Sequence, residues 1–191
     1  IHAIFLEFTP LVEPLSLDEA YLDVTESPHY QGSATLIAEA IRQRIFQCVQ
    51  LTASAGVSTN KLLAKIASGW RKPNGLFVIR PQDIDSFIKP LPVDELFGVG
   101  KVTAKKLHEL GFKRCVDLQA VSLDELINCF GEKGGNRLYE QCRGVDYRVV
   151  EPNRIRKSLS VEQTFKQDKE MNAECLSIMR ELYESLLLRI Q

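Results

Sequence analysis

Apolar residues recur at helical spacing over several stretches of the chain, and short apolar runs lie between these stretches. The clearest helical stretch covers residues 34–50 and follows Ser33, which supplies an N-cap. Its apolar positions are Leu36, Ile37, Ala40, Ile41, Ile45 and Val49. Two short apolar runs, residues 51–57 and 76–79, predict buried strands.

A second helix is expected between these two strands. The stretch Ser58-Thr59-Asn60 offers capping side chains for a helix over residues 61–70. The run Lys72-Pro73-Asn74-Gly75 then prevents the helix from continuing. Strands and helices therefore alternate up to residue 80, and this alternation predicts an α/β layer.

An acidic pair, Asp18 and Glu19, lies between two short apolar runs at residues 12–17 and 20–25. The runs predict a hairpin, with the pair entering the second strand. Neighbouring side chains on a regular strand point to opposite faces, so both reach one site only where the strand ends. Carboxylates beside a buried strand need a compensating partner, and Mg²⁺ is often held by one or two carboxylates plus substrate phosphates. A solvated turn is the alternative that the pair alone leaves open.

Strand signals vanish for about sixty residues after Arg80-Pro81, where only short helical patterns remain. They predict a compact all-helical subdomain with helices at residues 82–88, 93–97, 102–110, 123–130 and 135–142. Residues 147–157 are basic and aperiodic, as in a linker. Residues 158–165 alternate as a strand with one wet face does, and a helix is expected from residue 172 to the end. One strand and one helix cannot bury a core between them, so this last region is expected to be incomplete.

The composition is that of an ordinary globular protein, with 45% hydrophobic and 26% charged residues among 191. The chain shows no apolar run of about 18 residues and no signal-peptide pattern, so we expect a cytoplasmic protein without a membrane span. A net charge of -1 argues against wholesale electrostatic capture of nucleic acid. The five cysteines are scattered, and we assign them neither a metal nor a disulfide.

A second candidate motif is the stretch Leu96-Phe97-Gly98-Val99-Gly100-Lys101-Val102-Thr103, which predicts a helix-hairpin-helix. Glycines allow the backbone to approach a ligand, and the next helix points unpaired N–H groups at an anion. Such a loop grips one DNA phosphate without reading sequence. A dinucleotide-binding turn is the competing interpretation, but it requires a preceding strand and a third glycine, and Thr103 occupies that place.

Residues 55–68 and 71–75, taken with residues 14–23, closely resemble the palm of the Y-family, or translesion, DNA polymerases. The resemblance covers essentially the whole chain in the same order. It implies an α+β fold with a partial polymerase palm (a mixed sheet with helices), an all-helical helix-hairpin-helix thumb and the start of an α/β little-finger domain. The implied ranges are palm 1–80, thumb 81–146, basic linker 147–156 and truncated little finger 157–191.

The resemblance also implies roles for individual residues. Asp18 would ligate both catalytic Mg²⁺ ions, and Glu19 would serve the ion that activates the primer 3′-hydroxyl, whereas Asp23 would be structural. Lys72 would contact the triphosphate of the incoming dNTP. In the thumb, the hairpin residues Gly98, Val99, Gly100 and Lys101 would grip the DNA. Lys61 and Lys65 lie four residues apart on one helical face, and neither this spacing nor the resemblance settles a contact for them. We interpret them as charges at the surface or behind the residues that bind the metal.

The chain departs from the family pattern at both ends. The family's first palm strand with another metal aspartate, its fingers with the sugar-discriminating residue, most of the little finger and the clamp-binding C-terminal tail have no counterpart here. We therefore expect a fragment of a DNA-directed DNA polymerase that extends no primer itself. Its expected partners are primer–template DNA and dNTP, with the sliding clamp bound only through the missing tail, and we expect a monomer.

Two other functions stay open on the residues alone. One is a non-catalytic DNA-binding module built on the helix-hairpin-helix, in which Asp18 and Glu19 would be incidental. The other is a helix-hairpin-helix repair nuclease or glycosylase, which predicts strand cleavage or base excision instead of primer extension.

Overall fold

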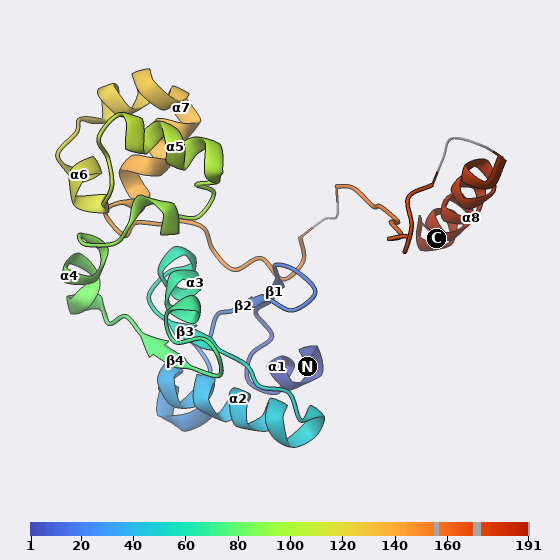
Figure 1. Ribbon diagram of the computed structural model, residues 1–191. Coiled ribbons are helices and arrows are strands. Elements are labelled where there is room, and N and C mark those ends of the chain that lie inside the picture. Colours follow the sequence, from blue (N-terminus) through green and yellow to red (C-terminus); the bar gives the residue numbers. More distant parts are fainter. Residues whose placement is uncertain (155–156, 170–172, 191) are drawn as a thin grey trace. The chain divides into compact units, whose positions relative to one another are not determined.

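The computed structural model describes residues 1–154, 157–169 and 173–190 (Figure 1). The chain divides into two units, Ile1–Pro152 and Asn153–Gln191. This division falls inside the stretch predicted as a linker. Each unit is described by itself below.

The first unit begins with a short helix and a two-stranded hairpin. Helix α1 (His2–Leu6) leads to β1 (Val12–Pro14) and β2 (Ala20–Leu22), which pair antiparallel with Val12 opposite Leu22 and Pro14 opposite Ala20. A 3-10 turn, η1 (His29–Gly32), precedes α2 (Ala34–Val49). The predicted N-cap is confirmed, because the Ser33 side chain accepts a hydrogen bond from the backbone N–H of Leu36.

A strand–helix–strand unit follows, as the alternation predicts. Strand β3 (Ala55–Val57) pairs in parallel with β4 (Leu76–Val78), and α3 (Lys61–Trp70) connects them. The Asn60 side chain caps α3 by accepting from the N–H of Leu63 at 3.0 Å. The expected combination of helices and strands is confirmed. In the described part of the chain the strands form two separate two-stranded sheets, one antiparallel and one parallel, and not the single mixed sheet that was expected.

We call residues 81–144 the helical lobe. It contains 3-10 turns η2 (Pro81–Asp83) and η3 (Val93–Glu95) and helices α4 (Ile84–Ile88), α5 (Lys101–Glu109), α6 (Cys115–Gln119) and α7 (Leu123–Gln141). The all-helical prediction is confirmed. Helix α7 combines the two helices predicted at residues 123–130 and 135–142, and its backbone leaves helical geometry at Gly131 (φ 73°, ψ 165°).

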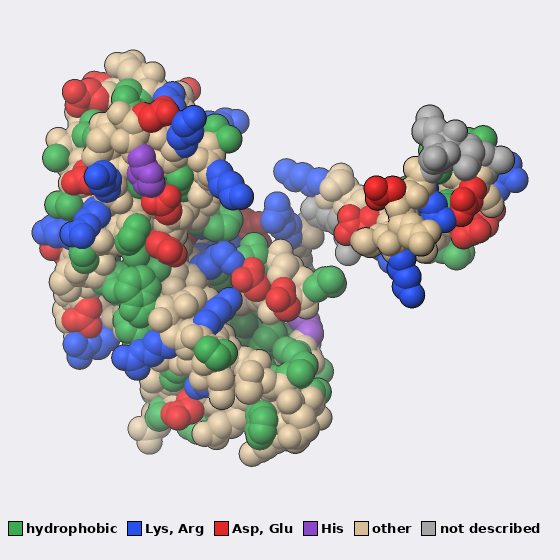
Figure 2. Space-filling model, viewed as in Figure 1, with side chains coloured by type: hydrophobic (Ala, Val, Ile, Leu, Met, Phe, Trp, Pro, Cys, Tyr) green, Lys and Arg blue, Asp and Glu red, His purple; other side chains and the backbone are tan. Residues whose placement is uncertain are grey.

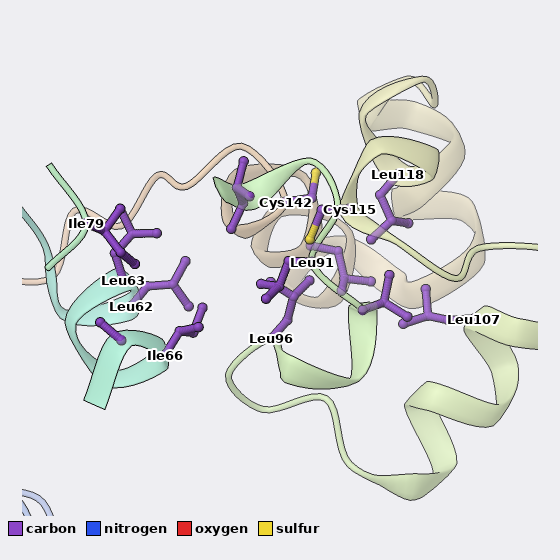
Figure 3. Packing of buried hydrophobic residues seen from close by; sticks show 14 of the residues in the cluster. Leu62, Leu63, Ile66, Ile79, Leu91, Leu96, Leu107, Cys115, Leu118 and Cys142 are labelled. Carbon is purple, nitrogen blue, oxygen red and sulfur yellow. The ribbon is translucent and has the colours of Figure 1, made fainter. Parts of the chain in front are cut away.

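One hydrophobic core joins the strand–helix–strand unit to the helical lobe. Figure 3 shows Leu62, Leu63 and Ile66 of α3 on one side of this cluster and residues of the lobe on the other. The lobe contributes Leu91, Leu96, Leu107, Cys115, Leu118, Leu126, Leu138 and Cys142. A smaller core joins α1 to α2 through Ile4, Ile37, Ile41 and Ile45. Because Leu62, Leu63 and Ile66 belong to the larger core, packing against the helical lobe fixes the position of α3.

The second unit contains α8 (Ala173–Ile190). The strand predicted at residues 158–165 is wrong, because these residues form no strand in the structure. Among the described residues of this unit, α8 is the regular element and no strand is present to pair with residues 158–165, and a strand is not stable without a partner. Within the described ranges, no helix combines the length and the apolar character that crossing a membrane requires.

Figure 2 shows Lys and Arg side chains interspersed with Asp and Glu over the presented face of the first unit. This mixture agrees with the net charge of -1. Local groups of residues, and not a field of one sign, must therefore provide any binding of an anionic partner.

Candidate active site and nucleic-acid-binding loop

The acidic pair lies on the turn between β1 and β2, outside the regular strands. The carbonyl oxygen of Glu19 accepts hydrogen bonds from the N–H groups of Leu15 (2.8 Å) and Ser16 (3.3 Å), which close the turn. The Ser16 hydroxyl donates to Asp18 Oδ1 at 2.7 Å, and the Asp18 side chain is exposed. Because strict alternation ends with the strand, both carboxylates can serve one site from this turn.

Glu19 is held by a basic residue of α3. Lys65 Nζ donates to both carboxylate oxygens of Glu19, at 3.0 and 2.8 Å, and the two side chains are 30% and 41% exposed. The sequence alone does not assign a partner to Lys65. Its spacing four residues after Lys61 was the only signal, and it does not name a partner.

Lys72 follows the C-terminal end of the same helix. Its backbone N–H donates to the carbonyl oxygen of Gly69 at 3.4 Å, and its side chain is exposed. Given a rise of 1.5 Å per residue, the last helical residue, Trp70, lies about 7.5 Å along the helix axis from Lys65, and Lys72 follows two residues later. The structure links Glu19 to α3 directly through Lys65, and Lys72 lies two residues beyond the end of that helix. It shows no contact of Lys72 with Asp18 or Glu19.

The donor set of the turn fits a hard divalent cation in type and is small in number. Carboxylate oxygens are the ligands that Mg²⁺ prefers, and it is usually bound by one or two of them with substrate phosphates and waters. Within the described ranges, no group of three or more His, Cys, Asp or Glu side chains is placed to hold a metal. Asp18 and Glu19 would therefore supply only part of a coordination shell.

Asp23 is occupied within its own turn. Its Oδ1 accepts from the backbone N–H of Thr25 at 3.0 Å and from the Thr25 hydroxyl at 2.6 Å. This side-chain turn motif is a common structural use of aspartate. The geometry therefore agrees with the structural role that the resemblance implies for Asp23.

The predicted hairpin loop joins η3 to α5. The N–H of Val99 donates to the carbonyl oxygen of Leu96 at 3.0 Å, and Gly98 takes a φ of +79° that favours glycine. Gly100 is the N-cap of α5, and no side chain caps this helix end. The N–H groups of the first turn are therefore available to an anion beside the exposed side chain of Lys101.

An acidic turn held by a lysine of a helix, followed by a helical lobe with a loop of the phosphate-binding type, is the arrangement expected for the palm and thumb of a nucleic-acid polymerase. The profile of the impB/mucB/samB family matches residues 1–69, and that of the DNA polymerase-iota thumb domain matches residues 94–146. The chain belongs to the Y-family of DNA polymerases. This result confirms the resemblance seen in the sequence.

Bacterial relatives and solved structures agree with the family. The chain is 56% identical over its 191 residues to DNA polymerase IV of Legionella pneumophila and 57% identical to that of Francisella tularensis subsp. novicida. It covers 54% of each, so the chain spans about half the length of the curated relatives it matches. The structure of a Y-family DNA polymerase chimera aligns over 78% of this chain and 44% of the length of the chimera, with a TM-score of 0.73 and 34% identity. DinB from Sulfolobus solfataricus aligns with 79% of this chain and 46% of its own length, with a TM-score of 0.70 and 34% identity.

Proposed function

We propose that the chain is part of a DNA-directed DNA polymerase for translesion synthesis, which transfers a nucleotide from dNTP to a primer 3′-hydroxyl. The observation that carries this proposal is the identity of 56% with a DNA polymerase IV over all 191 residues. Among the similar solved structures, one is named an insertion ternary complex of a DNA polymerase. Primer–template DNA and dNTP are therefore the proposed substrates.

Asp18 and Glu19 are the proposed ligands of the divalent cations, which we take to be Mg²⁺, with two ions in a complete enzyme. Such ions stabilise the attacking and leaving oxygens of phosphoryl transfer. Glu19 would exchange the Lys65 ammonium for a cation, and the contact is half-exposed, so this exchange breaks no buried pair. Lys72, whose long side chain is exposed, would contact the triphosphate.

The helical lobe is the proposed thumb, with Gly98, Val99, Gly100 and Lys101 as the DNA-binding loop. We keep the ranges palm 1–80, thumb 81–146, linker 147–156 and little finger 157–191. We further propose a cytoplasmic protein that is monomeric and that meets the sliding clamp through a segment outside this chain. The alternatives of a repair nuclease, a glycosylase or a non-catalytic module are not favoured, because the matched relatives are polymerases.

The metal site is tested by titrating the protein with Mn²⁺ in the presence of dATP. Binding is measured as the decrease of the electron paramagnetic resonance signal of free Mn²⁺. We expect the Asp18→Asn/Glu19→Gln variant to weaken binding about tenfold or more, because both carboxylates of the turn are neutralised. Asp23→Asn is the matched control, since Asp23 serves its own turn. Equal binding by all three chains would contradict the assignment of the acidic pair.

The thumb loop is tested by duplex-DNA binding at several salt concentrations. Replacing a lysine that contacts a phosphate lowers the salt slope by about one unit. We expect this decrease for Lys101→Met and not for Lys89→Met, because Lys89 pairs with Asp85 on α4 at 2.6 Å. A chain that binds no duplex, or equal slopes in the two variants, would refute the role of the loop.

A further inference from the structure

The chain segment that leaves the helical lobe is bound to the palm along its length. We call residues 144–151 the strap. Figure 1 shows this segment, in orange, passing from α7 over α3 to β1. Four hydrogen bonds to α3, its cap and β1 hold it. They are Asn60 Nδ2 to Gly144 O (2.8 Å), Leu62 N to Asp146 Oδ2 (2.9 Å), Lys61 Nζ to Val149 O (3.0 Å) and Glu151 N to Glu13 Oε2 (2.8 Å).

A buried ion pair is at the centre of this contact. Lys61 Nζ lies 2.6 Å from Glu13 Oε2, and the two side chains are only 9% and 8% exposed. The ammonium also lies 4.9 Å from the ring centre of Tyr21. Charges this far from water require a partner and further hydrogen bonds. The strap supplies one such hydrogen bond to each charge. The carbonyl oxygen of Val149 accepts from Lys61, and the N–H of Glu151 donates to Glu13.

The strap also reaches the DNA-binding loop. Arg148 pairs with Asp146 through two hydrogen bonds of 2.8 Å, and its guanidinium lies 5.0 Å from the ring centre of Phe97. Phe97 directly precedes Gly98 of the loop. At its other end the strap binds Glu13, which lies on β1, and β1 leads into the acidic turn. One short segment therefore contacts the residue just before the proposed DNA-binding loop and the strand that leads into the acidic turn.

We infer that Lys61 is a positioning residue that locks the strap onto the palm through Glu13. The locked strap fixes the thumb loop relative to the acidic turn, and hence the DNA relative to the carboxylates. This second step rests on the proposed function, whereas the locking itself does not. Lys61 touches neither of the proposed substrates in this scheme.

The first test measures tryptic cleavage after Arg148 under native conditions, with the fragments identified by mass spectrometry. Cleavage follows the population of the open strap when opening is fast. We expect Lys61→Met to accelerate this cut about tenfold or more. Lys65→Met is the matched control on the same helix, because Lys65 binds Glu19 and not the strap, and its cut should be unchanged.

Two further variants separate strap locking from general stability. The Lys61→Met/Glu13→Leu variant no longer contains the Glu13 carboxylate that Lys61→Met leaves without its lysine. Its free energy of global unfolding should therefore return towards that of the wild type. Its strap should stay as easily cut as in the single variant, because Val149 O and the N–H of Glu151 have lost their partners. Glu151→Pro removes that N–H together with an exposed side chain and should also speed the cut. Val150→Pro is its control, since no hydrogen bond of the Val150 N–H is present in the described part of the chain.

The second test maps where bound duplex DNA lies by loading the acidic turn with Fe²⁺ and ascorbate and sequencing the radical cuts. We expect cuts at a few nucleotides with the wild type and a spread two- to threefold wider with Lys61→Met/Glu13→Leu. If the wild type yields no cuts, the proposed function fails and the protease result still decides whether the strap is locked. If Lys61→Met is cut after Arg148 no faster than Lys65→Met, or if the two cut patterns are equal, the inference is wrong.

Discussion

Gly56, in the middle of β3, is the position at which α3 depends most directly on a missing side chain. A Cβ atom there would lie 2.1 Å from Ala64 O, 2.3 Å from Ser68 N and 2.8 Å from Ala67 C. All three are backbone atoms of α3, and contacts below 3.0 Å essentially never occur for a real Cβ. Since backbone cannot rotate aside, Gly56→Ala must push α3 away from β3 by about 1 Å.

The size of the effect follows from what α3 buries. Leu62, Leu63, Ile66 and Ala67 are at most 8% exposed, and they pack in the core shared with the helical lobe. Overpacking a core usually costs 1–3 kcal/mol, and here the clash cannot be relieved by a rotamer change. We expect Gly56→Ala to lower the free energy of unfolding by about 3 kcal/mol, a large share of the 5–15 kcal/mol typical of domains.

Gly69, which lies in α3 itself, is the matched control. No atom lies within 4 Å of its virtual Cβ, so Gly69→Ala meets open space. Alanine in a helix is more favourable than glycine by about 0.5–1 kcal/mol, so this variant should gain stability. Urea unfolding followed by far-UV circular dichroism measures both changes. A Gly56→Ala chain within about 0.5 kcal/mol of the wild type would refute the close-approach argument, as would a Gly69→Ala chain less stable than Gly56→Ala.

Two further predictions concern ionisable groups. Burial raises the pKa of Asp146, but hydrogen bonds from the Arg148 side chain and from backbone N–H groups outweigh it and hold the pKa below its usual range. The stabilisation is therefore present above about pH 4 and lost as the pH falls further. The urea midpoints of the wild type and Asp146→Asn should then converge as the pH falls below about 4, whereas a constant gap would contradict the assignment. Burial raises the pKa of Cys115 to about 12, so a thiol reagent at pH 8 should label exposed Cys48 in the native chain and Cys115 only after unfolding; similar labelling rates would show the site to be open.

Local chemistry made the α/β layer predictable from the sequence. Ser33 and Asn60 cap their helices through side-chain hydrogen bonds that span three residues. The Pro-Gly signal after Trp70 ends α3 where the structure ends it. These features depend on neighbours along the chain, so no knowledge of the tertiary structure was needed.

Elements without a local signal were missed. Helix α6 has only five residues, and Asp117 stabilises its start by accepting from the N–H groups of Lys113 and Arg114. These bonds hold the pKa of Asp117 below its usual range. So short a segment shows too little periodicity to be distinguished from a loop. The strand wrongly predicted at residues 158–165 is the opposite error, because alternation is a local signal but a strand needs a distant partner.

In the candidate site, the sequence identified the residue types and could not identify their partners. Glu13 and Lys61 are 48 positions apart, and nothing in the spacing pairs them. The same holds for Glu19 and Lys65, which are 46 apart. Only the fold, which lays the β1–β2 hairpin against α3, decides which lysine meets which carboxylate.

These two ion pairs show how one helix face can serve structure and chemistry together. Lys61 and Lys65 are one helical turn apart, yet the first pair is nearly inaccessible and the second is 30–41% exposed. A buried pair is costly to break, whereas an exposed pair contributes about 0–1 kcal/mol and can exchange partners readily. Glu13 is therefore suited to hold the hairpin in place, and Glu19, six residues later, is suited to release its lysine for a cation. The difference in burial between adjacent turns of α3 separates the two tasks.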